Sequence, residues 1–300
     1  MQTQIAIKKR QALLDFILWP ALYFAFVIPY LLVLHRIGEP SLLDAFPLIG
    51  LSPLLLLIIA TIVERVHPFN ANWNKPDMQT VNNILYMVTS NYSEIAGKSI
   101  ALFLAPVMVS HLAPGYEAQS IWLSSFPVAI QVAVGVLLYD FVYYWYHRFS
   151  HFLAPLWRLH RLHHATEKLN ALVLSRFNVL DIIIELFLLT SVMYWVGLPE
   201  KIYLIMTAFM IPATVLSHAN FEARLPRFLE WIVITPTTHR IHHSKDKTLL
   251  NRNFGGFTLF WDVVFKTYEP SGKNEINEIG ISNHHISRWF WGQLFDFLKK

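Results

Sequence analysis

The chain of 300 residues contains no cysteine. This absence excludes disulfides, cysteine-ligated iron–sulfur clusters and thiolate nucleophiles, so any metal chemistry has to use histidine nitrogens and oxygen ligands. Charge is also scarce, because Asp, Glu, Lys and Arg make up only 15% of the residues, against about 25% in soluble domains. The small net charge of +4, without a dense basic run, argues against nucleic acid as a partner.

The sequence instead contains long runs of apolar residues. Hydrophobic residues make up 54% of the chain, and the mean hydropathy is +0.40. A bilayer core needs about 20 apolar helical residues per crossing, and six stretches approach this length: 13–34, 43–63, 95–111, 121–146, 179–198 and 202–217. We therefore expect an all-α integral membrane protein with a bundle of about four to six transmembrane helices, the last pair being short enough to form a hairpin.

Lysine and arginine are distributed unevenly between the two sides of these stretches. With the N-terminus inside, only Arg36 and Lys201 fall in outer loops. Because short cytoplasmic loops carry the excess of basic residues, we expect a multi-pass protein whose N-terminus and C-terminus both lie on the cytoplasmic side.

Eight of the fourteen histidines occur in three tight groups. The spacing H-x-x-H-H occurs twice, whereas about 0.03 occurrences are expected by chance at this histidine content. Residues three and four apart share one face of a helix, so each group predicts a multidentate metal-binding face. The groups are His147 with His151, His160 with His163 and His164, and His239 with His242 and His243.

The number of imidazoles indicates more than one metal ion. A structural zinc site closes at four ligands, and neutral imidazole also suits iron, copper and nickel. Eight convergent histidines therefore favour a dinuclear centre, with iron as the redox-active metal. Two apolar stretches separate the second group from the third, so all groups emerge on the same cytoplasmic face, as a helical cap. His218 ends the sixth stretch on this face and is a plausible ninth ligand.

The other histidines lack companions at helical spacing. We expect His35 and His111 at outer ends of the apolar stretches, and His67, His284 and His285 on the surface.

Metal-bound imidazoles usually donate their second N–H to a carboxylate or carbonyl. Asp140 precedes His147 by about two helical turns on the same face and is the first candidate for this role. Glu167 and Asp246, which follow the second and third groups, are weaker candidates.

The segments 140–151, 157–165 and 236–244 resemble the three histidine boxes of the fatty acid hydroxylase/sterol desaturase superfamily. Shorter matches at 169–170, 176–177, 253–255 and 261–268 extend the resemblance over about 140–268. Lys266 departs from the pattern, because the family commonly has glycine at this position.

The resemblance implies a membrane-bound, non-haem di-iron enzyme that uses O2 to hydroxylate or desaturate a lipid C–H bond. It also implies three regions: N-terminal transmembrane helices in 1–120, a catalytic domain in 121–270 and a cytoplasmic tail in 271–300. The implied iron ligands are the eight grouped histidines, with His218 as the additional one: His147, His151, His160, His163, His164, His218, His239, His242 and His243.

The implied reaction needs electrons from elsewhere. The sequence has neither a His-Pro-Gly-Gly haem motif nor a G-x-G-x-x-G nucleotide fingerprint. We therefore expect a separate electron donor, of the cytochrome b5 type or a ferredoxin with its reductase, and a lipid substrate that enters from the bilayer. The sequence selects no particular lipid and no oligomeric state.

The alternative is a non-catalytic, histidine-rich membrane protein that binds or transports metal. Transport would require ionisable residues along the apolar stretches. Asp15, Asp44 and Glu185 are few and lie near the ends of those stretches, which disfavours this alternative.

Overall fold

The computed structural model describes residues 2–38, 45–112, 125–272, 276, 278–282 and 286–299. These residues form helices without a β-sheet, and one isolated bridge joins Ser244 to Ile279. The α-helices are α1 (Gln2–Ile37), α2 (Phe46–Val66), α3 (Met78–Leu112), α5 (Val128–Phe152), α6 (Ala154–His164), α7 (Val179–Val196), α8 (Glu200–Ser217), α9 (Arg227–Glu230), α10 (Pro236–His242), α11 (Lys247–Leu250), α12 (Phe260–Val264) and α13 (Phe290–Leu294). Short 3-10 helices are η1 (Ala71–Asn74), η2 (Ala171–Ser175) and η3 (Asp296–Leu298).

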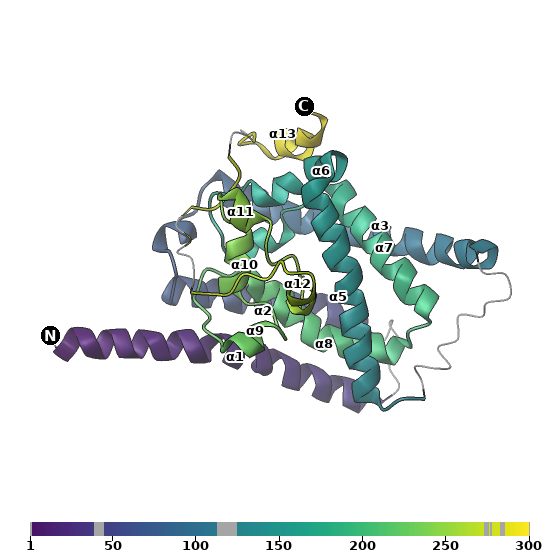
Figure 1. Ribbon diagram of the computed structural model, residues 1–300, viewed down its shortest axis with the longest axis horizontal. Helices are drawn as coiled ribbons and strands as arrows, with labels where there is room; N and C mark the ends of the chain where they lie inside the picture. The colour runs from purple at the N-terminus through teal and green to yellow at the C-terminus, as the bar shows by residue number, and fades with distance from the viewer. Residues whose placement is uncertain are drawn as a thin grey trace.

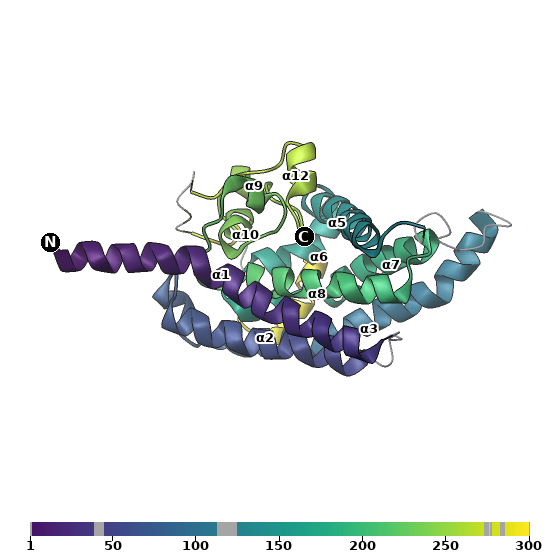
Figure 2. The same cartoon turned by 90° about the horizontal axis from the view of Figure 1, so that it is seen from below.

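Six of these helices are long and apolar enough to cross a membrane: Gln11–Ile37, Pro47–Val66, Met78–His111, Val128–Phe152, Val179–Val196 and Glu200–Ser217. This finding confirms the predicted all-helical class and the six apolar stretches. Of the predicted fourth stretch, residues 121–124 lie outside the described residues, as do residues 43 and 44 of the second. The bundle contains all six helices (Figures 1 and 2).

Helix α3 begins at Met78, well before the predicted start at 95. Its first half is rich in small polar residues, which lower the hydropathy of this segment, and several of them are buried in the fold. The Asn82 amide donates to the Arg288 carbonyl at 2.8 Å, and the Ser90 hydroxyl donates to the Ser175 carbonyl at 2.7 Å. Because tertiary partners satisfy these polar groups, the helix extends beyond its apolar half.

Helix α8 lies at the centre of the bundle. It packs against α1, α2 and α5, while α3 packs along α7. In its most apolar window 61% of the residues are buried, against 22–33% in the other five helices, which present more of their surface to the surroundings. The short helices α9, α10 and α12 gather on one side of the long helices (Figure 2).

Local sequence features place the histidine-bearing segments. Pro155 cannot donate a backbone hydrogen bond, so the chain breaks at Leu153 between α5 and α6 and turns there. Helix α10 begins with Pro236 behind a capping box in which Thr235 and Thr238 bond reciprocally.

The C-terminal segment packs against α3 and α6. The Arg161 guanidinium forms a buried ion pair with Asp296 at 3.1 Å, and the Tyr86 and Phe290 rings lie 4.9 Å apart. The tail is therefore packed against α6, which carries the second histidine group, and against the neighbouring α3.

Candidate metal centre

All nine predicted ligands converge in two adjacent clusters, which we call the histidine centre. Within each cluster the ligand atoms lie within 4.8 Å of one another. Eight of the nine side chains are buried, and His151 is half-buried. The first cluster contains His147, His151, His160, His164 and His242, and the second contains His163, His218, His239 and His243.

The two clusters share a boundary. The rings of His164 and His243, one from each cluster, are stacked with centroids 4.6 Å apart. His163 and His164 are adjacent in sequence but belong to different clusters, and the same is true of His242 and His243. Each of the second and third boxes therefore supplies ligands to both positions.

The spacing of the nitrogens fits metal ligation. The Nε2 atoms of His147 and His242 are 3.0 Å apart, those of His218 and His239 are 3.0 Å apart, and those of His163 and His218 are 3.1 Å apart. A metal–nitrogen bond is about 2.0–2.1 Å long, so two ligands at right angles are separated by about 3.0 Å. In addition, His151 Nε2 is buried and has no hydrogen-bond partner in the described part of the chain. A metal ion would satisfy these nitrogens.

The remaining histidines lie elsewhere. His111 is exposed and its Nδ1 contacts the Val107 carbonyl, whereas His67 is half-buried and pairs with Asp15. His35 is exposed near the end of α1, and the predicted surface positions 284 and 285 are outside the described residues.

One loop holds three ligands of the first cluster through their second ring nitrogen. The Arg252 carbonyl lies 2.8 Å from His242 Nδ1, and the Phe254 carbonyl lies 2.7 Å from His147 Nδ1. The Asn251 side-chain oxygen lies 3.3 Å from His151 Nδ1. Such partners fix the ring orientation and raise the basicity of the ligating nitrogen.

The carboxylate that contacts a ligand is Asp181, at the start of α7. It is fully buried, lies 3.0 Å from His160 Nδ1 and accepts a hydrogen bond from the Tyr146 hydroxyl. Sequence reasoning missed Asp181 because it is 21 residues from His160 and belongs to no histidine box. The only available signal was an acidic residue at the first turn of an apolar helix.

Asp140, predicted for this role, forms its hydrogen bonds with another segment of the chain. Its carboxylate accepts hydrogen bonds from the backbone N–H groups of Gly256 and Phe257 at 3.0 Å and from the Thr258 hydroxyl at 2.6 Å. It therefore anchors the chain that follows the ligand-holding loop. Asp246, a weaker candidate for this role, caps α11, where its side chain accepts a hydrogen bond from the Thr248 N–H.

Asp262 and Lys266 shape the same region. Asp262 accepts hydrogen bonds from the N–H groups of Phe254 and Gly255, and burial raises its pKa to about 6. Lys266 has φ of 61°, in the left-handed region that favours glycine. The backbone conformation that glycine would favour is thus present although the side chain differs.

Packing also restrains the second cluster. The Phe177 ring stacks on His163 with centroids 4.0 Å apart and an interplanar angle of 12°. Next to it, the fully buried Arg176 donates to the Leu162 carbonyl, which precedes His163. Phe177 and Arg176 therefore restrain the position of His163.

Burial favours the neutral form of several of these imidazoles. Desolvation, with help from neighbouring imidazoles, lowers the pKa of His163, His164, His239 and His243 well below the usual value. Desolvation also lowers the pKa of His218 to about 3. Neutral imidazole is the form that binds metal, so these ligands need not lose a proton at pH 7.

The chain is similar to known proteins over the region of the histidine groups. Residues 132–267 match the family model described as fatty acid hydroxylase. An ornithine lipid hydroxylase from Rhizobium tropici is 30% identical over 238 residues, which cover 79% of this chain and 71% of the relative. No match was found among solved structures.

More distant relatives act on other lipids. An alkylglycerol monooxygenase from Homo sapiens is 28% identical over 165 residues, 51% of this chain and 36% of the relative. A very-long-chain aldehyde decarbonylase from Oryza sativa subsp. japonica is 22% identical over 209 residues, 65% of this chain and 30% of the relative. From the matched histidine-box region and the extent of the bacterial relative, we conclude that the chain belongs to the fatty acid hydroxylase superfamily.

Proposed function

We propose that this protein is a di-iron oxygenase that hydroxylates a C–H bond of a membrane lipid. The observation that carries the proposal is the pair of adjacent, buried imidazole clusters. The relatives named hydroxylase and monooxygenase favour hydroxylation over desaturation, which begins with the same hydrogen abstraction. Its two irons would be held by the five and the four histidines of the two clusters.

The choice of iron follows from the donor set. Imidazole binds several first-row metals, but a closed four-ligand zinc site uses fewer ligands than this centre offers. Bound iron would supply the activation of O2 for C–H oxidation. The balance is one lipid C–H bond, O2, two electrons and two protons giving one C–OH group and one water. This is a monooxygenase reaction in which a separate donor supplies both electrons.

The protein's own residues would orient the ligands and exclude water. Asp181 and the carbonyls of Arg252 and Phe254 hold ligand rings from outside, as described above. The burial of the ligands keeps bulk water from the reacting atoms, which limits side reactions.

The substrate chain would approach along the membrane side of the centre. Tyr143 lies one turn below His147 on α5, and its ring contacts that histidine with centroids 5.4 Å apart. Beyond it, Tyr139 belongs to an apolar cluster that includes Met206 and Met210 of α8. Flexible methionines adapt to ligands of irregular shape, so this region suits an alkyl chain arriving from the bilayer.

The sidedness and the donor are part of the proposal. The distribution of basic residues supports a cytoplasmic position for the N-terminus, the histidine centre and the C-terminus. A cytochrome b5-type protein or a ferredoxin with its reductase would then reach the centre from the cytoplasm.

The test is isotopic labelling of lipid. Membranes containing the protein, supplied with reduced ferredoxin and ¹⁸O2, are extracted and compared with membranes containing His242→Ala. A lipid carrying one ¹⁸O atom only in the unsubstituted sample supports the proposal. A new double bond without label would make the enzyme a desaturase. Metal binding without any lipid product, both with reduced ferredoxin and with reduced cytochrome b5 in a parallel sample, would favour the non-catalytic metal-binding alternative.

A further inference from the structure

A polar cavity of about 500 Å³ lies beside α1 and near the ends of α2 and α8. The membrane-crossing windows of α2 and α8 end at Val66 and Ser217. Residues that follow these two ends line the cavity together with Gln11 and Asp15 of α1, and α10 forms another wall. The cavity therefore lies at the level where the apolar bundle gives way to polar surroundings, which is the depth of lipid headgroups.

The cavity is separate from the histidine centre, although both use α10. Thr237, Arg240 and Ile241 face the cavity, whereas His239, His242 and His243 belong to the metal clusters. One short helix thus divides the two regions.

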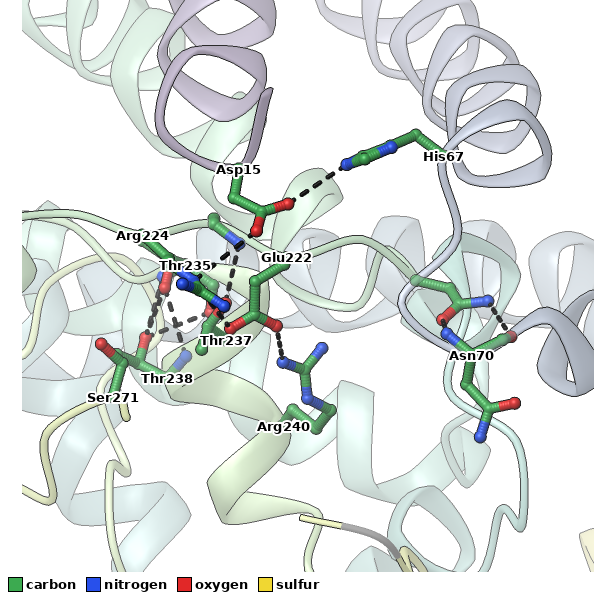
Figure 3. A network of polar contacts seen from close by, with 12 residues as sticks. Asp15, His67, Asn70, Glu222, Arg224, Thr235, Thr237, Thr238, Arg240 and Ser271 are labelled. Carbon is green, nitrogen blue, oxygen red and sulfur yellow. Dashed lines mark hydrogen bonds and ion pairs between the residues drawn. The ribbon is translucent and has the colours of Figure 1, made fainter. Parts of the chain in front are cut away.

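The walls carry charges of both signs (Figure 3). Asp15 lies 3.2 Å from His67 Nε2 and 3.6 Å from Arg224 Nε. Glu222 contacts Arg240 and lies 3.9 Å from Arg224 Nε. Two carboxylates and two guanidinium groups balance each other, so the cavity is not suited to a free anion of high charge.

One hydrogen-bond donor in this wall is buried and unused. Within the described part of the chain, Arg240 Nη1 has no partner, and the Arg240 side chain is only 4% exposed. Its guanidinium carbon lies 3.5 Å from the centroid of the Phe69 ring. A buried donor without a partner costs about 1–3 kcal/mol, so this nitrogen favours an acceptor in the cavity. The Arg224 side chain is 63% exposed and has room to contact the same acceptor.

We infer that the cavity binds the headgroup of a zwitterionic phospholipid, with the phosphate at Arg240 and Arg224 and the ammonium at Asp15 and Glu222. A zwitterion matches balanced walls because each of its charges meets the opposite one. The apolar side chains of Phe69, Ile241 and Ile276 suit the adjoining glycerol carbons. Charge-assisted hydrogen bonds to phosphate and ammonium are stronger than neutral ones. The inference concerns binding and goes beyond the proposed oxygenase reaction.

The test measures lipid retention in metal-free protein, so its outcome does not depend on iron or turnover. Protein purified in detergent is mixed with phosphatidylethanolamine or phosphatidylglycerol, and bound lipid is counted by native mass spectrometry. We expect about tenfold tighter binding of phosphatidylethanolamine, as expected for charge-assisted contacts at the ammonium. Equal binding of the two lipids would overturn the inference. Displacement of the lipid by millimolar inorganic phosphate would also overturn it, because the cavity would then recognise free phosphate.

Variants distinguish the two halves of the headgroup. Arg224→Gln removes a phosphate contact and should weaken both lipids, whereas Asp15→Asn should weaken phosphatidylethanolamine alone. Lys245→Gln is the control, because Lys245 pairs with Glu278 at 3.3 Å outside this cavity. Thermal melting confirms that each variant is folded. Binding by folded Arg224→Gln and Asp15→Asn at the level of the control would refute the assignment.

Discussion

Replacing Asp181 by asparagine tests how the first histidine cluster is held. The Asp181 carboxylate is fully buried, and its oxygen lies 3.0 Å from His160 Nδ1. The substitution keeps the size of the side chain but removes its negative charge. That charge favours a proton on His160 Nδ1 and raises the basicity of His160 Nε2, the nitrogen that would bind metal. Losing such a partner weakens metal binding by about 10- to 100-fold, which corresponds to about 1.4–2.7 kcal/mol.

The assay is iron retention during titration with a competing chelator, by elemental analysis of protein in detergent. Asp140→Asn is the matched comparison, because Asp140 is equally buried but bonds to Gly256, Phe257 and Thr258 instead of a histidine. We expect Asp140→Asn to lower the melting temperature while iron affinity stays closer to that of the unsubstituted protein. Iron binding by folded Asp181→Asn as tight as in the unsubstituted protein would refute the reasoning.

Three further predictions concern the histidines and the tail. His163→Ala should abolish lipid product formation while membrane insertion, measured by fractionation, stays intact; full activity with native metal content would exclude His163 as a ligand. Arg161→Met should destabilise the protein by about 1.5–3 kcal/mol, because the buried Asp296 loses the guanidinium at 3.1 Å and keeps the ammonium of Lys299 at 3.2 Å; an unchanged free energy of unfolding would contradict this. Burial lowers the pKa of His218 from 6.5 to about 3. Between these two pH values the unfolded chain binds a proton at His218 that the folded chain does not bind. Metal-free protein should therefore melt at a lower temperature at pH 5 than at pH 7.5, and a higher melting temperature at pH 5 would contradict this.

Periodic features of the sequence predicted the long apolar helices and the histidines that converge in the two clusters. The six apolar stretches match the six long helices, and the spacing within His160, His163 and His164 places all three on the inner face of α6. Both kinds of pattern depend on helical geometry over a few turns, which a sequence displays directly. His218 was found by its position at the end of an apolar stretch.

Contacts between distant segments were not predictable in this way. The partner of His160 is Asp181 rather than an acid near a box, and carbonyl groups hold His147 and His242. Any residue supplies a carbonyl, so no residue type signals this role. The early start of α3 was hidden for a related reason, because buried asparagine and serine side chains find partners only in the folded bundle.

The central claim is that the histidine centre holds two iron ions. Iron content per chain is the most direct test, measured by elemental analysis of protein purified anaerobically in detergent, beside His163→Ala. The account predicts close to two irons per chain, with less iron in the variant. One zinc per chain, or no metal in protein shown to be folded, would contradict it.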